Sequence, residues 1–312
     1  MSSSTTTPVR SEHSYGLIQG TSAYLIWGLL PAYFLLLPKI SAVEFVAVRV
    51  LFSLIFCFIL LVATSQIRAF APMFRDTKTM GQLALASILI AGNWVLYALA
   101  VLTGHVLEAS LGYFINPIVA ILLGVIVLKE KLRPLQWAAV ALATVAVIVL
   151  TVGLGRVPWI SLGLAFSFGF YGLVKNKVGS KGSALGALTI ETLWLTPLAI
   201  IYLIWLSQTT GSTLFNSNWA GILLLASSGI ITAVPLLLFG GAARRLPLST
   251  VGSLQFIAPL LQFILGILVF GEHMPFERWM GFILVWIAVI FVLIDMLRAP
   301  RAGRIPEPKK VG

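Results

Sequence analysis

The chain has 312 residues, of which 59% are hydrophobic and only 10% are charged, and its net charge is +11. Because a soluble domain averages about a quarter charged residues, this composition excludes an ordinary water-soluble protein and predicts a membrane protein. The basic residues fall between long apolar runs and form no patch, so the positive charge predicts no nucleic-acid partner.

Ten apolar segments follow one another along the chain, each long enough to cross a hydrocarbon core, which takes about 20 helical residues. Their composition does not alternate as the strands of a membrane barrel do, so we predict an all-α membrane protein. The ten predicted transmembrane helices are 15–37, 43–63, 81–102, 105–128, 134–153, 157–176, 184–206, 218–240, 247–270 and 276–297. Residues 1–13 are predicted as a disordered cytoplasmic tail and residues 298–312 as a basic cytoplasmic tail.

Three of the charged side chains inside these predicted spans stand out as functional candidates, because a charge at mid-helix costs roughly 2.5–3.5 kcal/mol on insertion scales. Arg49 and Glu108 lie toward the outer face of the membrane, and we predict that they pair as a polar gate. Glu191 lies toward the inner face, where it is a candidate gate and proton-coupling site. An alternative stays open for each residue: Arg49 snorkels to the headgroups, and Glu108 occupies a favourable helix start. For Glu191 the alternative is a structural ion pair or a hydrogen bond to Thr192.

Two prolines and several polar or aromatic residues mark a candidate cavity. Pro117 in the fourth span and Pro259 in the ninth each remove a backbone donor, so we predict kinked helices that serve either gating or packing alone. The predicted lining of the substrate cavity is Asn93, Trp94, Tyr113, Asn116 and Gln255. For any single aromatic ring, packing or anchoring at the membrane interface is the favoured explanation.

A shift of 142 residues superimposes the two halves of the chain. The matched pairs include Phe114 with Phe256, Pro117 with Pro259, Glu130 with Glu272, Trp137 with Trp279 and Arg49 with Glu191. Each half, 14–153 and 154–297, carries five predicted spans, and because five is odd the second half must enter the membrane upside down. Inverted repeats of this kind recur in secondary transporters, with the binding site near the repeat interface.

The distribution of Lys and Arg predicts the orientation of the chain. If the N-terminus is cytoplasmic, 17 of the 21 basic residues fall in cytoplasmic segments, whereas the loops on the other side hold only Lys39 and Arg156. We therefore expect both termini in the cytoplasm of a multi-pass protein of the cell membrane.

Sequence signatures of enzymes and cofactor sites are missing. The chain holds no Gly-x-x-x-x-Gly-Lys-Ser/Thr phosphate loop and no His-Glu-x-x-His zinc motif. His13, His105 and His273 lie in a tail or at span ends, and they form no cluster with carboxylates at helical spacing. We predict no catalytic residue, no metal ligand and no cofactor; an intramembrane enzyme would need a convergent acid–base or metal set.

Several segments resemble the EamA-type branch of the drug/metabolite transporter superfamily, and within it the RarD-type permeases. The resemblance covers about residues 14–297 and is carried by Tyr24–Gly28, Gly92–Trp94, Glu108–Pro117, Lys129–Leu132, Gly163–Phe168, Phe170–Leu173, Glu191–Trp194 and Gly271–Glu272. It implies ten helices, a central cavity and the export or uptake of small molecules. The chain departs from the family pattern at Phe256, where the resemblance leads us to expect a tyrosine after Gln255.

We therefore predict a secondary active transporter (permease) of small metabolites or drugs. It would work by alternating access between the two repeats, with proton coupling through a buried glutamate as one option. Its expected partners are a small-molecule substrate and membrane lipid, while the substrate, the direction of transport and the oligomeric state stay open. The alternatives are a non-transporting membrane assembly or receptor subunit and, less favoured, an intramembrane enzyme.

Overall fold

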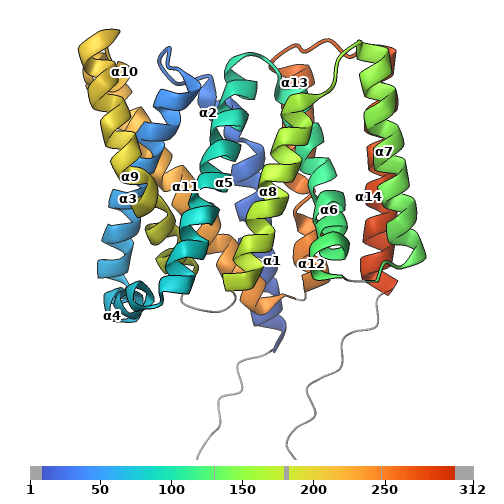
Figure 1. The fold of residues 1–312 in the computed structure, drawn as a ribbon, viewed down its shortest axis with the longest axis horizontal. Helices are drawn as coiled ribbons and strands as arrows, with labels where there is room; N and C mark the ends of the chain where they lie inside the picture. The colour runs from blue at the N-terminus through green and yellow to red at the C-terminus, as the bar shows by residue number, and fades with distance from the viewer. Residues whose placement is uncertain (1–8, 130, 179–182, 247, 299–312) are drawn as a thin grey trace, which may run out of the picture.

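The computed structural model describes residues 9–129, 131–178, 183–246 and 248–298. Within these ranges the regular structure is helical throughout, and the helices stand side by side in one bundle (Figure 1). The predicted all-α fold class is thereby confirmed. The first helix begins at Val9, inside the predicted N-terminal tail, whereas residues 1–8 and 299–312 of the two predicted tails lie outside the described residues.

Each of the ten predicted spans matches one long helix or two consecutive helices. These are α1 (Val9–Gly28) with α2 (Leu30–Phe34), α3 (Ala42–Ala63), α5 (Thr77–Leu102), α6 (Val106–Leu128), α7 (Pro134–Leu154), α8 (Trp159–Val178), α9 (Ala184–Thr209), α11 (Trp219–Arg245), α12 (Leu248–Leu254) with α13 (Ile257–Leu268), and α14 (Phe276–Arg298). The connections contain three short helices, α4 (Ile67–Phe70), the 3-10 helix η1 (Ala71–Arg75) and α10 (Thr213–Asn216).

Seven helices of the described chain are long and apolar enough to cross a membrane, namely α3, α5, α6, α7, α9, α11 and α14. Two shorter apolar helices, Trp159–Lys175 and Ile257–Leu268, fall in α8 and α13. The structure is therefore compatible with ten spans.

Side-chain caps begin four of the long helices. Ser41, Asp76, Ser183 and Asn218 each accept a hydrogen bond from the backbone N–H three residues later, at 2.9–3.2 Å. These caps satisfy donors that a helix leaves unpaired at its first turn. The helices α3, α5, α9 and α11 thus begin at short polar residues placed just before their apolar runs.

The helix breaks differ in part from the two predicted kinks. A break at Gln255 and Phe256 separates α12 from α13, so Pro259 lies in the first turn of α13, where helices leave their N–H groups unpaired. Pro117 lies inside α6, which stays helical from Val106 to Leu128. A further break, which the sequence analysis did not predict, separates α1 from the short helix α2 with its Pro31.

The chain enters its two halves from opposite ends of the bundle. Figure 1 shows that α1 begins and α14 ends at the end that carries α4, whereas α10 lies at the opposite end. We call these the α4 end and the α10 end. Because successive long helices alternate in direction, the first repeat starts at the α4 end and the second at the α10 end, as inverted repeats require.

Equivalent helices of the two repeats pack against one another. The helix pairs α3 with α9, α6 with α13, and α7 with α14 each join a helix to its counterpart. The helix α1 packs on α11 just as α8, its counterpart, packs on α5. Phe114 and its equivalent Phe256 stack with ring centroids 6.4 Å apart. This exchange of partners is what a two-fold relation between the halves produces, and it interleaves them around a shared core.

Candidate substrate-binding site

Arg49 is at the centre of the polar groups that the structure gathers inside the bundle. Its side chain extends from α3 and is only 6% exposed, so it does not reach the surface as a snorkelling arginine would. Its Nε donates a hydrogen bond to Oγ1 of Thr232 on α11 at 2.7 Å. Its guanidinium carbon lies 4.3 Å from the ring centroid of Trp94 on α5, a cation–π contact. Within the part of the chain that the structure describes, this guanidinium forms no ion pair.

Three tyrosines lie close enough to Arg49 to interact with its charge; they are Tyr33, Tyr97 and Tyr113. The Tyr113 hydroxyl donates to Oδ1 of Asn93 at 3.2 Å, and Nδ2 of Asn93 donates to Oγ of Ser167 on α8 at 2.9 Å. The Tyr97 hydroxyl is buried and has no hydrogen-bond partner among the described residues. We refer to six of these side chains as the Arg49 site: Arg49, Asn93, Trp94, Tyr97, Tyr113 and Thr232.

The structure brings some of the predicted lining residues together and leaves others apart. Asn93, Trp94 and Tyr113 lie in the Arg49 site, whereas the sequence analysis assigned Arg49 to a separate gate. Asn116 follows Tyr113 by one turn of α6, and its Oδ1 is buried without a partner among the described residues. No described contact joins Gln255 to the Arg49 site, and Phe256 stacks on Phe114. The lining role of all five residues stays a prediction.

Sequence analysis missed Tyr97 and Thr232. Tyr97 follows Trp94 by three residues on the same helix, so the spacing of Asn93, Trp94 and Tyr97 was a usable signal for one polar and aromatic face. Thr232 is 183 residues from Arg49, and no local pattern joins the two. Its contact depends on how closely α3 and α11 approach each other.

Gly229, one turn before Thr232 on α11, allows this close approach. A Cβ at this glycine would overlap the backbone of Phe52 and Ser53 on α3, whereas a Cβ at Gly92 meets nothing within 4 Å. We expect Gly229→Ala to destabilise the protein by about 1–3 kcal/mol, because α11 must move away from α3. Thermal unfolding should show a lower melting temperature for this variant than for the control Gly92→Ala. Equal melting temperatures would contradict the close packing of α3 and α11.

The predicted ion pair between Arg49 and Glu108 is wrong in this structure. Glu108, in the first turn of α6, pairs instead with Arg156, and its backbone carbonyl accepts a hydrogen bond from Ser161 of α8 at 2.7 Å. The connection between α7 and α8 carries Arg156 to the start of α6. Arg49 is held elsewhere by Thr232. The helix start that the sequence analysis gave as the alternative for Glu108 is what the structure shows.

Glu272 lies beside this ion pair at the α10 end, in the connection between α13 and α14. It accepts a hydrogen bond from the backbone N–H of Leu107 at 3.0 Å, and Arg278 lies 3.8 Å from its other carboxylate oxygen. The pKa of Glu272 is raised to about 7, mainly because its carboxyl is buried. The nearby charge of Glu108 also raises this pKa, whereas the backbone N–H groups of Leu107 and Val106 and the charge of Arg278 lower it.

A carboxyl pKa that folding raises makes stability depend on pH. The contribution of Glu272 is fully present below its ordinary pKa of 4.5 and is lost as the pH rises through about 7. We therefore expect the melting temperature of the wild type to fall between pH 5 and pH 8. Glu272→Gln keeps the acceptor for Leu107 but cannot ionise, so its melting temperature should change less over this range. Parallel curves for the two proteins would show that Glu272 does not titrate there.

Glu191 makes a buried ion pair between α8 and α9. It is 1% exposed, and its carboxylate accepts hydrogen bonds from Nζ of Lys175 at 2.6 Å and from the hydroxyl of Tyr171 at 3.1 Å. The Thr192 hydroxyl, the alternative partner of Glu191, donates to the carbonyls of Leu188 and Thr189 instead. The two repeat-equivalent charges thus differ: Glu191 has a counterion, whereas Arg49 forms no ion pair among the described residues.

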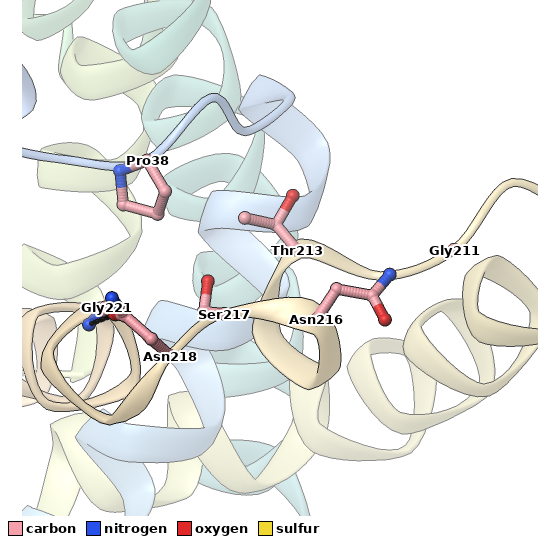
Figure 2. A pocket seen from close by; sticks show the side chains of 7 residues that line it. All are labelled: Pro38, Gly211, Thr213, Asn216, Ser217, Asn218 and Gly221. Atoms are coloured by element: carbon pink, nitrogen blue, oxygen red, sulfur yellow. Dashed lines mark hydrogen bonds between the residues drawn. The ribbon is translucent and has the colours of Figure 1, made fainter.

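A pocket of about 450 Å³ opens at the α10 end (Figure 2). It lies between the connection after α2 and the segment around α10, and its lining residues are Pro38, Gly211, Thr213, Asn216, Ser217, Asn218 and Gly221. None of these belongs to the predicted site. Beside it the buried carboxylate of Glu44, which sequence analysis also missed, accepts hydrogen bonds from Ser212 and Thr213 at 2.8 and 2.9 Å. These bonds tie the start of α3 to the start of α10.

Comparison with known proteins identifies relatives over nearly the whole chain. The model of the EamA-like transporter family matches twice, at residues 14–152 and 157–294. Protein RarD of Streptomyces exfoliatus is 47% identical, covering 94% of this chain and 93% of the relative. Protein RarD of Escherichia coli (strain K12) is 41% identical, covering 92% and 96%. A protein of Pseudomonas aeruginosa named as an uncharacterized transporter is 42% identical, covering 94% and 97%.

A solved crystal structure shares the fold. It aligns with a TM-score of 0.58 at 14% identity, covering 92% of this chain and 99% of that chain. At this identity the likeness supports the fold alone.

Proposed function

This chain belongs to the EamA-like transporter family, as a RarD-type permease rather than an enzyme, and we propose that it is a secondary transporter that moves a small solute by alternating access. The observation that carries the proposal is the composition of the Arg49 site. Arg49 and Trp94 belong to the first repeat and Thr232 to the second, with the hydrogen bond from Arg49 to Thr232 joining them. A relative movement of the repeats would therefore open or close this site.

The two-fold packing supports the same mechanism. Because each repeat contributes the same helices in opposite orientation, one arrangement of the two halves has a counterpart that faces the other side of the membrane. The solute would be bound by Asn93, Trp94, Tyr113 and Asn116 around Arg49. Gln255, in the break between α12 and α13, would join this lining only in another arrangement of the repeats.

Uptake into liposomes tests transport. Purified protein should first be screened by thermal shift against metabolites and drugs, and the most stabilising solute should then be offered, labelled, to liposomes that contain the protein. A transporter gives saturable uptake above that of protein-free liposomes. Binding without such uptake would favour the receptor or assembly subunit and contradict the proposal.

We propose in addition that the α4 end faces the cytoplasm of a cell-membrane protein, because 17 of the 21 basic residues fall in segments assigned to that side. Reporter fusions at Ser41, His105, Arg156, Ser212 and Gly271 should then all report the outside. Fusions at Arg75 and Lys131 serve as controls and should report the cytoplasm. A cytoplasmic signal at two of the five positions would contradict this orientation.

The proposal also includes coupling of transport to protons through Glu191. The ion pair with Lys175 stabilises the charged form of the carboxylate in the present arrangement. A movement of α8 relative to α9 that separates the pair would leave a buried carboxylate without its counterion, which favours proton uptake. Coupling would therefore follow from breaking this pair in one of the two access states.

A further inference from the structure

We propose that the transported solute carries a carboxylate and that Arg49 binds it, an inference that rests on the proposed transport function. The solute would be a monoanion with an apolar or aromatic body. Four features of the Arg49 site support this: its unbalanced charge, its free donors, its single cationic group and its aromatic walls.

The charge of Arg49 is the first feature. Of the four buried carboxylates in the described chain, three have counterions: Glu108 pairs with Arg156, Glu191 with Lys175 and Asp295 with Arg133. The fourth, Glu44, forms no ion pair among the described residues, but both of its oxygens accept hydrogen bonds, from Ser212, Thr213 and the Leu214 N–H. Arg49 is as buried as these carboxylates, yet within the described chain it forms no ion pair. A buried charge without a counterion destabilises the fold, and such a charge is typical of a site that serves a ligand.

The donors of the Arg49 site are the second feature. Thr232 accepts from Nε, and Trp94 covers one face of the guanidinium, but no described residue accepts a hydrogen bond from Nη1 or Nη2. Two neighbouring guanidinium N–H groups match the two oxygens of a carboxylate. The Tyr97 hydroxyl, which is buried and has no hydrogen-bond partner among the described residues, is a further donor next to this charge.

The remaining two features select the kind of anion. One guanidinium balances one negative charge, whereas a phosphate monoester carries about −1.5 to −2 at neutral pH. The rings around Arg49 are apolar apart from their hydroxyl or N–H tips. The ring centroids of Tyr97 and Tyr113 are 5.8 Å apart, and the Phe168 ring meets the Tyr113 ring edge-on with centroids 6.2 Å apart. Such walls suit a carboxylate with an apolar body better than a strongly hydrated dianion.

Binding of a matched set of probes to the purified protein tests the proposal. Phenylacetate, phenylacetamide, phenethylamine and benzylphosphonate share one ring and differ in head-group charge, and hexanoate with hexanamide repeats the comparison on an aliphatic body. We expect at least one of the two carboxylates to bind, with an affinity at least about tenfold above that of its amide. The proposal is overturned if neither carboxylate binds. It is also overturned if an amide, the amine or the phosphonate binds as tightly as the carboxylate with the same body.

Two variants connect this preference to the site. Arg49→Gln should reduce the carboxylate-to-amide ratio of affinities to about one. Tyr97→Phe removes a hydroxyl that forms no hydrogen bond within the described part of the chain, so it should keep the wild-type melting temperature and still weaken carboxylate binding several-fold. An unchanged ratio in a folded Arg49→Gln variant, or unchanged binding in Tyr97→Phe, would overturn the assignment.

Flux separates this inference from the proposed function. Carboxylate binding that depends on Arg49, without any uptake into liposomes, would refute transport and leave the anion site standing. Saturable uptake of a neutral or cationic solute that is insensitive to Arg49→Gln would support transport and refute the anion site.

Discussion

Arg49→Gln is expected to reduce saturable solute flux by roughly 10- to 100-fold, the value of a lost charge-assisted hydrogen bond. At the same time the melting temperature should stay the same or rise, because the change removes a buried charge that forms no ion pair in the described structure. A residue that is retained for function at the expense of stability behaves in this way. The measurement is uptake into liposomes paired with thermal unfolding of the same preparation.

Arg49→Lys is the matched control for charge. It keeps a cation on α3 but lacks the planar fork that bonds Thr232 and lies against Trp94, so we expect flux between that of the wild type and that of Arg49→Gln. A structural role for Arg49 predicts a different pattern. In that case both variants would lose melting temperature and flux together.

Glu191→Gln is expected to have the second-largest effect, on both stability and coupling. Removing one partner of a buried ion pair costs about 3–5 kcal/mol, and we expect the lower end because Lys175 is 29% exposed. The variant should also lose the dependence of solute accumulation on a pH gradient while it keeps solute exchange at equilibrium. Accumulation at several imposed pH gradients, measured beside the melting temperature, checks both effects.

The double variant Glu191→Gln with Lys175→Gln separates structure from coupling. It leaves no unpaired charge between α8 and α9, so much of the lost stability should return. Coupling should not return, since the carboxylate is still missing. A double variant that again accumulates solute in proportion to the pH gradient would exclude Glu191 as the coupling group.

The helices were predictable from the sequence because hydropathy is a local signal. Each predicted span matches a helix or a helix pair, and the caps at Ser41, Asp76, Ser183 and Asn218 stand where the apolar runs begin. The break after Gly28 was not predicted, since a long apolar run hides a short interruption. Pro117 is the opposite case: it is a strong sequence signal for an interruption, yet α6 remains helical through it.

The internal repeat also indicated which residues of the two halves are structurally equivalent, which the transmembrane spans alone do not. Residues that coincide at a shift of 142 come into contact where the two-fold relation brings equivalent helices together, as Phe114 and Phe256 do. The equivalence of Arg49 and Glu191 was also visible in the sequence. Their environments were not, because each is determined by neighbours on other helices, Thr232 for Arg49 and Lys175 for Glu191.

The partner of Arg49 was assigned wrongly because depth in the membrane does not identify lateral neighbours. Arg49 and Glu108 were paired on the ground that both lie toward the same face. The actual counterion of Glu108, Arg156, lies 48 residues away and was counted only as a basic residue of a loop. Placing such pairs requires the packing of α6 against α8, which hydropathy does not contain.

Counterflow tests alternating access most directly. Liposomes that contain the protein are loaded with a high concentration of the most stabilising unlabelled solute and diluted into a trace of the same solute carrying a label. A carrier with one site that is exposed to one side at a time takes up the label transiently above its equilibrium level, because the excess unlabelled solute inside occupies the inward-facing sites and slows the exit of the label. We expect this overshoot for the wild type and its loss in Arg49→Gln. Monotonic equilibration of the label in the wild type, without an overshoot, would show an open pathway and contradict alternating access.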